Sequence, residues 1–121
     1  MKSYGQLCAA ALALDVIGDR WSLLIVRELL LDGPRRWTDL RAGLPGVAKN
    51  LLAERLRTLE DAGVLTRTGG ERYALTPRGE GLRPVLDALV AWGAPLVRDA
   101  PEEHLARAGF VATACRIHPQ A

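Results

Sequence analysis

The sequence has 121 residues, of which 49% are hydrophobic and 25% are charged, and its formal net charge is +2. This length and composition fit one folded domain over residues 1–121 and exclude a mainly disordered chain. No apolar run approaches the ~20 residues that a membrane-spanning helix needs. The first residues lack a signal-peptide pattern, so we expect a cytoplasmic protein with no membrane partner.

Two amphipathic helices are predicted at the start of the chain. Apolar residues recur at spacings of three and four over residues 6–17, and Gly18 ends this pattern. Asp19 is a suitable N-cap for a second helix over residues 20–31, which the following Asp-Gly-Pro sequence stops.

A helix-turn-helix is predicted next. Thr38 is expected to cap a short helix over residues 39–42, after a brief extended piece at residues 36–37. A break at residues 43–46 separates it from a longer helix over residues 47–62. The inward-facing side of the longer helix is expected to consist of Ala48, Leu52, Leu56 and Leu59.

A β-hairpin is predicted after the longer helix. Residues 64–68 alternate in polarity, and Gly69-Gly70 is a strong signal for a two-residue turn before a returning strand over residues 71–75. A helix-turn-helix that is followed at once by a hairpin is a winged helix. We therefore predict a mainly α fold with a small β-hairpin, in the form of a winged helix-turn-helix.

One further helix is predicted towards the C-terminus. Thr76 and Pro77 open it as N-cap and first helical residue. The helix is expected to run to about Trp92, and Pro84 is a point at which it could kink. Residues 94–121 stay unassigned.

Polar side chains occupy the opposite face of the helix over residues 47–62. Asn50, Glu54 and Arg57 point directly away from its leucines. A recognition helix needs an apolar back and a polar front that enters the major groove, where asparagine pairs with adenine and arginine with guanine. An ordinary exposed face of an amphipathic helix has the same pattern, so both interpretations stay open. The candidates for contact with DNA on this helix are Lys49, Asn50, Ala53, Glu54, Arg55 and Arg57.

Basic residues also flank this helix. Residues 35–57 contain six basic and two acidic residues, a net charge of +4, as expected for a nucleic-acid contact. The alternatives are that the hydroxyl of residue 38 only caps its helix, and that the hairpin carries scattered, solvated charge. The candidates are Arg35, Arg36 and Thr38 for the phosphate backbone, and Arg67 and Arg72 in the hairpin for the minor groove.

Four segments occur in the order and spacing of a known family. They are Cys8 with LDVIGDRW, which ends at Trp21; GPRRWTDLRAGLPGVAKNLLAERLRTLEDAGV, from Gly33 to Val64; YALTPRG, from Tyr73 to Gly79; and LRPVLDALVAWG, from Leu82 to Gly93. Over this core, residues 8–93, the chain resembles the HxlR-type family of winged helix-turn-helix transcriptional regulators, which are relatives of the MarR-type regulators. Ala48 departs from the small hydroxyl residue that usually begins the recognition helix of the family.

The resemblance implies a regulator that binds double-stranded DNA at a pseudo-palindromic operator as a homodimer. It also implies that the N-terminal and C-terminal helices form the dimer interface. The alternative is that the apolar stripes of these helices pack within one subunit. The residues assigned to the interface are Leu7, Ala11, Leu14, Leu82, Val85, Leu86, Leu89 and Trp92.

Control by a redox signal or a small molecule is a finer implication of the resemblance. Cys8 lies where many members carry a cysteine that in some of them senses oxidants or electrophiles, a role that needs an accessible, thiolate-prone sulfur. The proline that usually follows is Ala9 here, and a buried Cys8 that acts as a small hydrophobe is the alternative. A small-molecule effector near Tyr4, Trp21 and Trp92 is a further hypothesis, against ordinary core packing of these rings.

Nothing in the sequence indicates catalysis. No Ser/His/acid set, phosphate-binding loop or paired acidic motif occurs, and Cys8, Cys115, His104 and His118 lack metal-ligand spacing. We predict no enzyme activity, no metal and no cofactor. The alternative function, from another class, is a winged-helix module that binds a protein partner without binding DNA.

Overall fold

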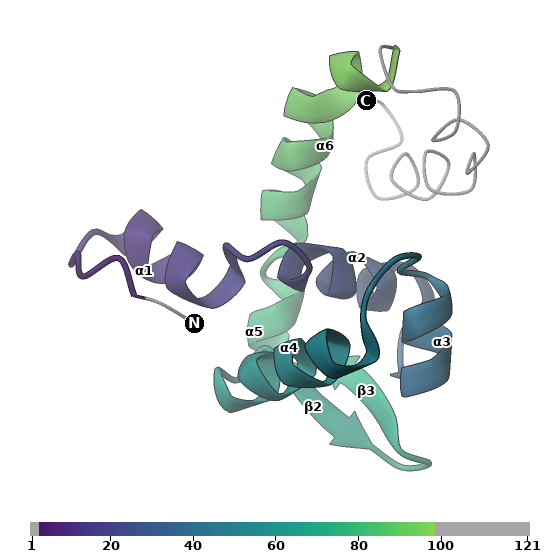
Figure 1. Cartoon of the computed structure of the whole chain (residues 1–121). Coiled ribbons are helices and arrows are strands. Elements are labelled where there is room, and N and C mark those ends of the chain that lie inside the picture. The colour runs from purple at the N-terminus through teal and green to yellow at the C-terminus, as the bar shows by residue number, and fades with distance from the viewer. Residues whose placement is uncertain (1–2, 99–121) are drawn as a thin grey trace. The chain divides into compact units, whose positions relative to one another are not determined.

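The computed structural model of the chain describes residues 3–98 (Figure 1). Among these residues, no helix is long and apolar enough to span a membrane. The chain divides into two compact units, of which the first ends at Glu80 and the second begins at Gly81. Most of the unassigned tail, from residue 99 onward, lies outside the described residues, as do Cys115, His104 and His118.

The first unit is a winged helix, as predicted. Its helix-turn-helix consists of α3, α4 and the turn between them, and its hairpin of β2 and β3 projects from the helices (Figure 1). The elements in chain order are α1 (Ala9–Ile17), α2 (Ser22–Asp32), β1 (Arg35–Arg36), α3 (Trp37–Ala42), α4 (Lys49–Asp61), β2 (Leu65–Thr68), β3 (Arg72–Leu75) and α5 (Pro77–Glu80).

The sheet has one strand more than the predicted hairpin. β1 pairs antiparallel with β3, and β3 pairs antiparallel with β2, so the strand order is β1-β3-β2. The pairing places Arg36 opposite Arg72. β1 overlaps the extended piece predicted at residues 36–37, but a two-residue strand is too short for an alternating pattern to predict its pairing.

The hairpin loop is longer than predicted. Thr68 pairs with Arg72, so three residues connect the strands, and the prediction of a two-residue turn was wrong. Gly70 and Glu71 both have positive φ, at 75° and 58°. Glycine adopts this conformation freely, whereas glutamate adopts it at a cost. The extra loop residue is therefore Glu71, and glutamate is not a residue type that predicts a turn.

The leucine row of α4 is the centre of the core. Leu52, Leu56 and Leu59 are buried, as predicted. Ala48 is exposed, so its predicted inward position was wrong: it occupies the N-cap of α4, with extended backbone, before the first helical turn. The rest of the first unit's buried hydrophobic core consists of Ile17, Ile25, Val26, Leu29, Leu40, Leu44, Val47, Val64, Leu65 and Tyr73.

Four helices begin at other residues than predicted, and two of them, α2 at Ser22 and α4 at Lys49, begin two residues later. α1 begins at Ala9, so Leu7 precedes the helix and is 95% exposed. α3 begins at Trp37 with Arg36 at its N-cap, so the prediction that Thr38 caps this helix was wrong. The hydroxyl of Thr38 lies within the first turn instead, because pairing of β1 with β3 holds Arg36 in extended backbone directly before the helix.

The predicted C-terminal helix is two helices. Thr76 caps α5 as predicted, since its Oγ1 accepts a hydrogen bond of 3.1 Å from the backbone N–H of Gly79. α5 ends at Glu80, and the second unit contains α6 (Arg83–Arg98). Pro84 therefore lies in the first turn of α6, where a proline costs no helical hydrogen bond, and does not kink a continuous helix.

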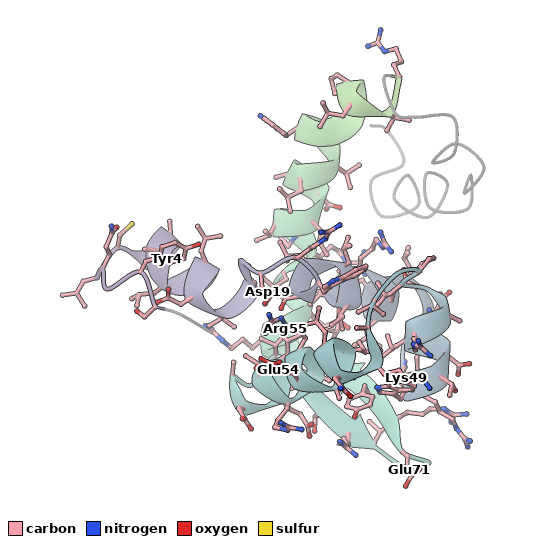
Figure 2. The ribbon with its side chains drawn as sticks, in the orientation of Figure 1. Tyr4, Asp19, Lys49, Glu54, Arg55 and Glu71 are labelled. Carbon is pink, nitrogen blue, oxygen red and sulfur yellow. The ribbon has the colours of Figure 1, made fainter. Side chains whose placement is uncertain are left out.

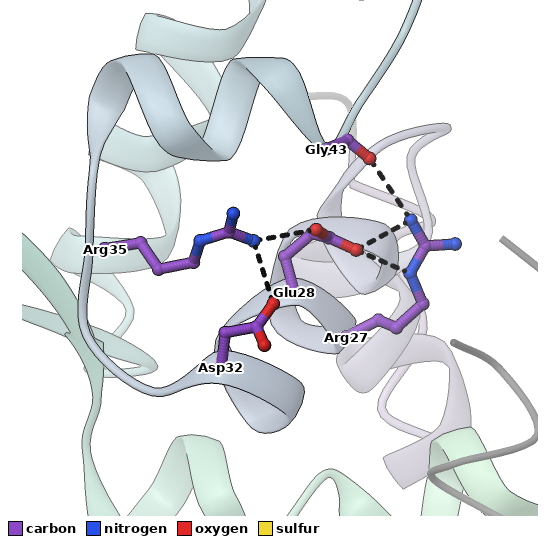
Figure 3. A network of polar contacts seen from close by, with 5 residues as sticks. All are labelled: Arg27, Glu28, Asp32, Arg35 and Gly43. Carbon is purple, nitrogen blue, oxygen red and sulfur yellow. Dashed lines mark hydrogen bonds and ion pairs between the residues drawn. The ribbon is translucent and has the colours of Figure 1, made fainter. Parts of the chain in front are cut away.

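A buried carboxylate joins α2 to β1 and to the helix-turn-helix (Figure 3). Glu28 is 5% exposed; its Oε2 lies 3.0 Å from Arg27 Nη2, and its Oε1 lies 2.9 Å from Arg35 Nη1. Arg35 Nη1 also lies 3.3 Å from Asp32 Oδ2, and Arg27 Nη2 lies 3.5 Å from the carbonyl oxygen of Gly43. A buried charge is stable only with such partners, so this network fixes β1 and the end of α3 against α2.

Replacement of Gly43 by alanine is expected to destabilise the fold. A Cβ on residue 43 would collide with Oε1 of Glu28 and lie 2.8 Å from its Cδ, while two arginines hold that carboxylate in place. We expect Gly43→Ala to lower the free energy of unfolding by about 1–3 kcal/mol, measured by urea denaturation with circular dichroism. Gly69→Ala is the matched control, because a Cβ there meets no atom within 4 Å. Equal denaturation midpoints for the two variants would contradict the tight contact.

Candidate nucleic-acid interface

The outer face of α4 is polar and exposed. Lys49, Asn50 and Arg57 are exposed, and so are Ala53 and Glu54, while the leucine row on the opposite face is buried. The burial of the leucines therefore determines which side chains face away from the first unit. Figure 2 labels Lys49 at the start of this helix and Glu54 further along it. Five of the six side chains that the sequence placed on this face are thus available to an outside partner.

Arg55 is the sixth, and it lies differently. Its side chain is 17% exposed, and its Nε lies 3.1 Å from Oδ1 of Asp19 (Figure 2). This contact is an ion pair by distance only, because its geometry is not that of a hydrogen bond. Asp19 Oδ1 also accepts hydrogen bonds from the backbone N–H groups of Trp21 and Ser22 at the start of α2, but the N-cap of this helix is Trp21 and not Asp19 as predicted. The structure therefore directs the guanidinium of Arg55 towards the α1–α2 junction.

Two arginines meet at the tip of the wing. Arg36 on β1 and Arg72 on β3 are exposed and stand opposite each other in the sheet. A Cβ built on Gly70 would lie 3.9 Å from a guanidinium nitrogen of each. Neither arginine has an ion-pair partner among the described residues. Two adjacent cations without a counter-charge favour an anionic partner such as phosphate.

The other basic candidates have partners within the chain. Arg35 is held by the carboxylates of α2, as described above. Arg67 on β2 is exposed, but its Cζ lies 4.8 Å from the centroid of the Tyr73 ring and its Nε lies 3.6 Å from Oε1 of Glu60. Thr38 is exposed on α3 beside a hollow of about 410 Å³. The sequence-predicted residues thus divide into a free exposed set and a set that the fold already uses.

Exposed apolar residues occur on α1 and, in the second unit, on α6. On α1, Leu14 is exposed and Ala11 is half-buried. On α6, the largest exposed side chain is Trp92, at 78%. Leu86 is buried, and Leu82 just before the helix is half-buried. The other large hydrophobic residues exposed on the two helices are Leu12, Val85, Leu89, Leu96 and Val97, of which Leu12, Leu96 and Val97 were not predicted at the interface.

The Cys8 thiol is exposed at the N-cap of α1. The nearby backbone N–H groups of Ala11 and Ala10 hold the pKa of this thiol below its ordinary value. Sγ makes no cap hydrogen bond of ordinary geometry, so the effect is that of N–H dipoles at a helix start. The alternative of a buried, hydrophobe-like Cys8 does not hold, because the side chain is exposed.

Sequence reasoning did not identify the acidic residues that organise this site. Glu28 pairs with the nearby Arg27 and Arg35, whereas Asp19 pairs with Arg55 in a distant segment, and no local pattern predicts that distant pair. A signal for Glu28 does exist, since a lone acid within the apolar run of α2 must find a partner. The rings of Tyr4 and Trp92 are exposed, so ordinary core packing within the chain does not account for them.

Comparison with known proteins places the chain among transcriptional regulators. The model of the family described as HxlR-like helix-turn-helix matches residues 16–100. An HTH-type transcriptional regulator of Synechocystis sp. is 36% identical over 91 residues, which cover 70% of this chain and 67% of that protein. The crystal structure of quinone-bound YodB from B. subtilis has a TM-score of 0.64 and 32% identity, covering 71% of this chain and 96% of that one. The redox regulator HypR in its oxidized form has a TM-score of 0.63 and 29% identity, with coverages of 73% and 96%.

Proposed function

Since the chain belongs to the HxlR-like helix-turn-helix family, we propose that it binds a pseudo-palindromic operator in duplex DNA as a homodimer and so controls transcription. The family consists of DNA-binding transcriptional regulators and not of enzymes. The observation that carries the proposal is the exposed polar face of α4 opposite its buried leucine row. In a homodimer, two such helices would enter successive major grooves about 34 Å apart.

The roles of the contact residues follow from their chemistry and exposure. Asn50 and Arg57 are assigned to adenine and guanine in the major groove. Lys49, the first residue of α4, is assigned to phosphate, which the N-terminus of a helix also favours. Arg72 is assigned to the minor groove beside the wing, and Arg36, which the sequence had placed at a phosphate, is reassigned to the same groove because it stands opposite Arg72 in the sheet. Glu54 lies between Asn50 and Arg57 on the outer face and is assigned to the amino group of a cytosine. The remaining exposed candidates, assigned to the edges of the contact, are Thr38, Ala53 and Arg67.

The base-reading assignment predicts the effect of two substitutions. Selection from a pool of random duplexes first provides a preferred site, and fluorescence anisotropy then measures its affinity. We expect Asn50→Ala and Arg57→Ala each to weaken binding to that site by about 1–3 kcal/mol, because each removes a bidentate contact to a base. Lys49→Gln is the control, because loss of a phosphate contact weakens binding to selected and mixed-sequence DNA alike.

The same titrations separate the proposal from its rival. Unchanged affinity in both alanine variants would move base reading to another face of the protein. If the unaltered protein shows no salt-dependent binding to any duplex, the winged helix is a protein-interaction module instead.

The homodimer is supported by apolar surface on the terminal helices. Val85, Leu89 and Trp92 are exposed and recur along one side of α6, and Leu14 is exposed on α1. A contiguous exposed apolar stripe of this kind is typical of an interface between proteins. A second copy of the chain is the partner that a pseudo-palindromic operator requires.

A charge within the α6 stripe should therefore separate the subunits. We expect Leu89→Glu to be monomeric at micromolar concentration in sedimentation velocity, where the unaltered chain is dimeric, because the interface would have to bury a carboxylate. Ala91→Glu places the same charge at an exposed position away from the stripe and should stay dimeric. A dimeric Leu89→Glu protein would exclude α6 from the interface.

Control by an electrophile is proposed to act through Cys8. Three observations support it: the thiol is exposed, its pKa is lowered, and the similar proteins include quinone-bound YodB and oxidized HypR. An accessible thiolate attacks quinones and peroxides faster than a thiol does.

We expect a benzoquinone to weaken operator binding by the unaltered protein and to leave Cys8→Ser unaffected. Because the folded pKa of Cys8 is lowered, thiolate is present above that pKa and is lost as the pH falls through it. In a Cys115→Ser background, the alkylation rate of Cys8 should therefore rise at a lower pH in the folded chain than in urea. An equal quinone response in Cys8→Ser would remove this cysteine from the mechanism.

A further inference from the structure

We propose that Arg55 serves DNA binding as a positioning residue, and that its ion pair with Asp19 holds the recognition helix α4 against the α1–α2 junction without a contact of its own to DNA. The proposal rests on the DNA-binding function proposed above. It reassigns one residue that the sequence pattern had placed among the DNA contacts.

Asp19 is a fixed point in the first unit. Its side chain is 9% exposed, and its Oδ1 accepts hydrogen bonds of 3.0 Å from the backbone N–H groups of Trp21 and Ser22. Its Oδ2 accepts a hydrogen bond of 2.5 Å from the hydroxyl of Ser22, which is fully buried. The carboxylate is thus anchored to the start of α2 before any residue of α4 is considered.

Arg55 brings α4 to this anchor. Its Nε lies 3.1 Å from Asp19 Oδ1, and α4 contacts both α1 and α2. The side chain is 17% exposed, whereas Arg57 and Lys49 on the same helix are exposed. Separating a largely buried ion pair leaves a charge without its partner, which is strongly unfavourable. Arg55 therefore stays with Asp19 when the outer face of α4 meets an anion.

The other end of the guanidinium contacts an exposed side chain of α4. Nη1 of Arg55 donates a hydrogen bond of 3.3 Å to Oε1 of Glu54, whose side chain is 58% exposed. Contacts therefore run from Asp19 through Arg55 to an acceptor on the outer face of α4. An acceptor in that place can take a hydrogen bond from the amino group of cytosine. Arg55 thus controls both the position of the helix and the orientation of one of its outer side chains.

Salt dependence distinguishes a positioning residue from a contact. Affinity for DNA falls as the salt concentration rises. Each lost phosphate contact makes the plot of log affinity against log salt less steep by about 0.9. A small shift of the recognition helix weakens its bidentate contacts to bases, which need exact geometry, whereas a long flexible side chain such as that of Lys49 still reaches a phosphate, so the slope is retained. The two roles also differ in coupling, because residues that act through one ion pair give non-additive effects.

The test is a double-mutant cycle of Asp19→Asn and Arg55→Gln, titrated with the selected duplex over a series of salt concentrations. Asparagine has a side-chain carbonyl oxygen, so Asp19→Asn removes the charge and keeps an acceptor for the N–H groups of Trp21 and Ser22. We expect each single variant to bind the site about five- to thirtyfold more weakly, with an unchanged salt slope. The double variant should resemble either single variant.

Lys49→Gln is the matched control on the same helix. It removes an exposed charge, so its effect should be additive with Asp19→Asn and should lower the salt slope by about 0.9. Arg55→Lys is the second variant in case Arg55→Gln does not fold. Lysine keeps the positive charge but lacks the planar fork, so a positioning role predicts weaker binding, whereas a phosphate contact predicts nearly full affinity.

Three outcomes would overturn the inference: a lower salt slope in Arg55→Gln, additive effects of the two substitutions, or tighter binding by Asp19→Asn because Arg55 is released to a phosphate. Each of these requires that the unaltered chain binds DNA. Absence of DNA binding by the unaltered chain at every salt concentration would instead overturn the proposed function, and this inference with it.

Discussion

Burial of three leucines on α4 is the constraint on which the candidate site depends. Leu52, Leu56 and Leu59 lie in the core, and a helix with one buried face has no freedom to choose the face it exposes. The same hydrophobic contacts that stabilise the first unit therefore present Asn50 and Arg57 to the outside. Stability and recognition use opposite sides of one helix, so the outer residues can change without loss of the fold.

Charge is divided between the interior and the surface in a way that suits this helix. Glu28 and Asp19 pair with Arg35 and Arg55 inside the first unit, where these pairs hold β1 and α4 in place. The exposed Arg36 and Arg72 at the wing have no such partners among the described residues. The arginines of this segment therefore have two roles. Arg35 and Arg55 stabilise the fold through ion pairs, whereas Arg36 contributes charge to the surface.

The sequence predicts most of this fold because helical periodicity and turn residues are local signals. The order of the helices, the helix-turn-helix and the hairpin were all predicted from these local signals. An extended piece was predicted at residues 36–37, but its pairing with β3 as β1 was not, because two residues have no period. The third loop residue, Glu71, was not predicted either, because nothing in the sequence indicates a positive φ at a glutamate. Within the site, the outer face of α4 was predictable, whereas the pairing of Arg55 was not. An ion pair between distant segments depends on packing that no local pattern contains.

The missing side chain of Gly43 has a consequence for how chains of this kind can diverge. The carboxylate of Glu28 fills the space that a Cβ on residue 43 would need. A larger residue at 43 is compatible with the fold only if residue 28 becomes shorter, and Arg35 then loses its buried counter-charge. Positions 28, 35 and 43 should therefore change together in evolution, as one correlated set, even though they belong to three separate elements.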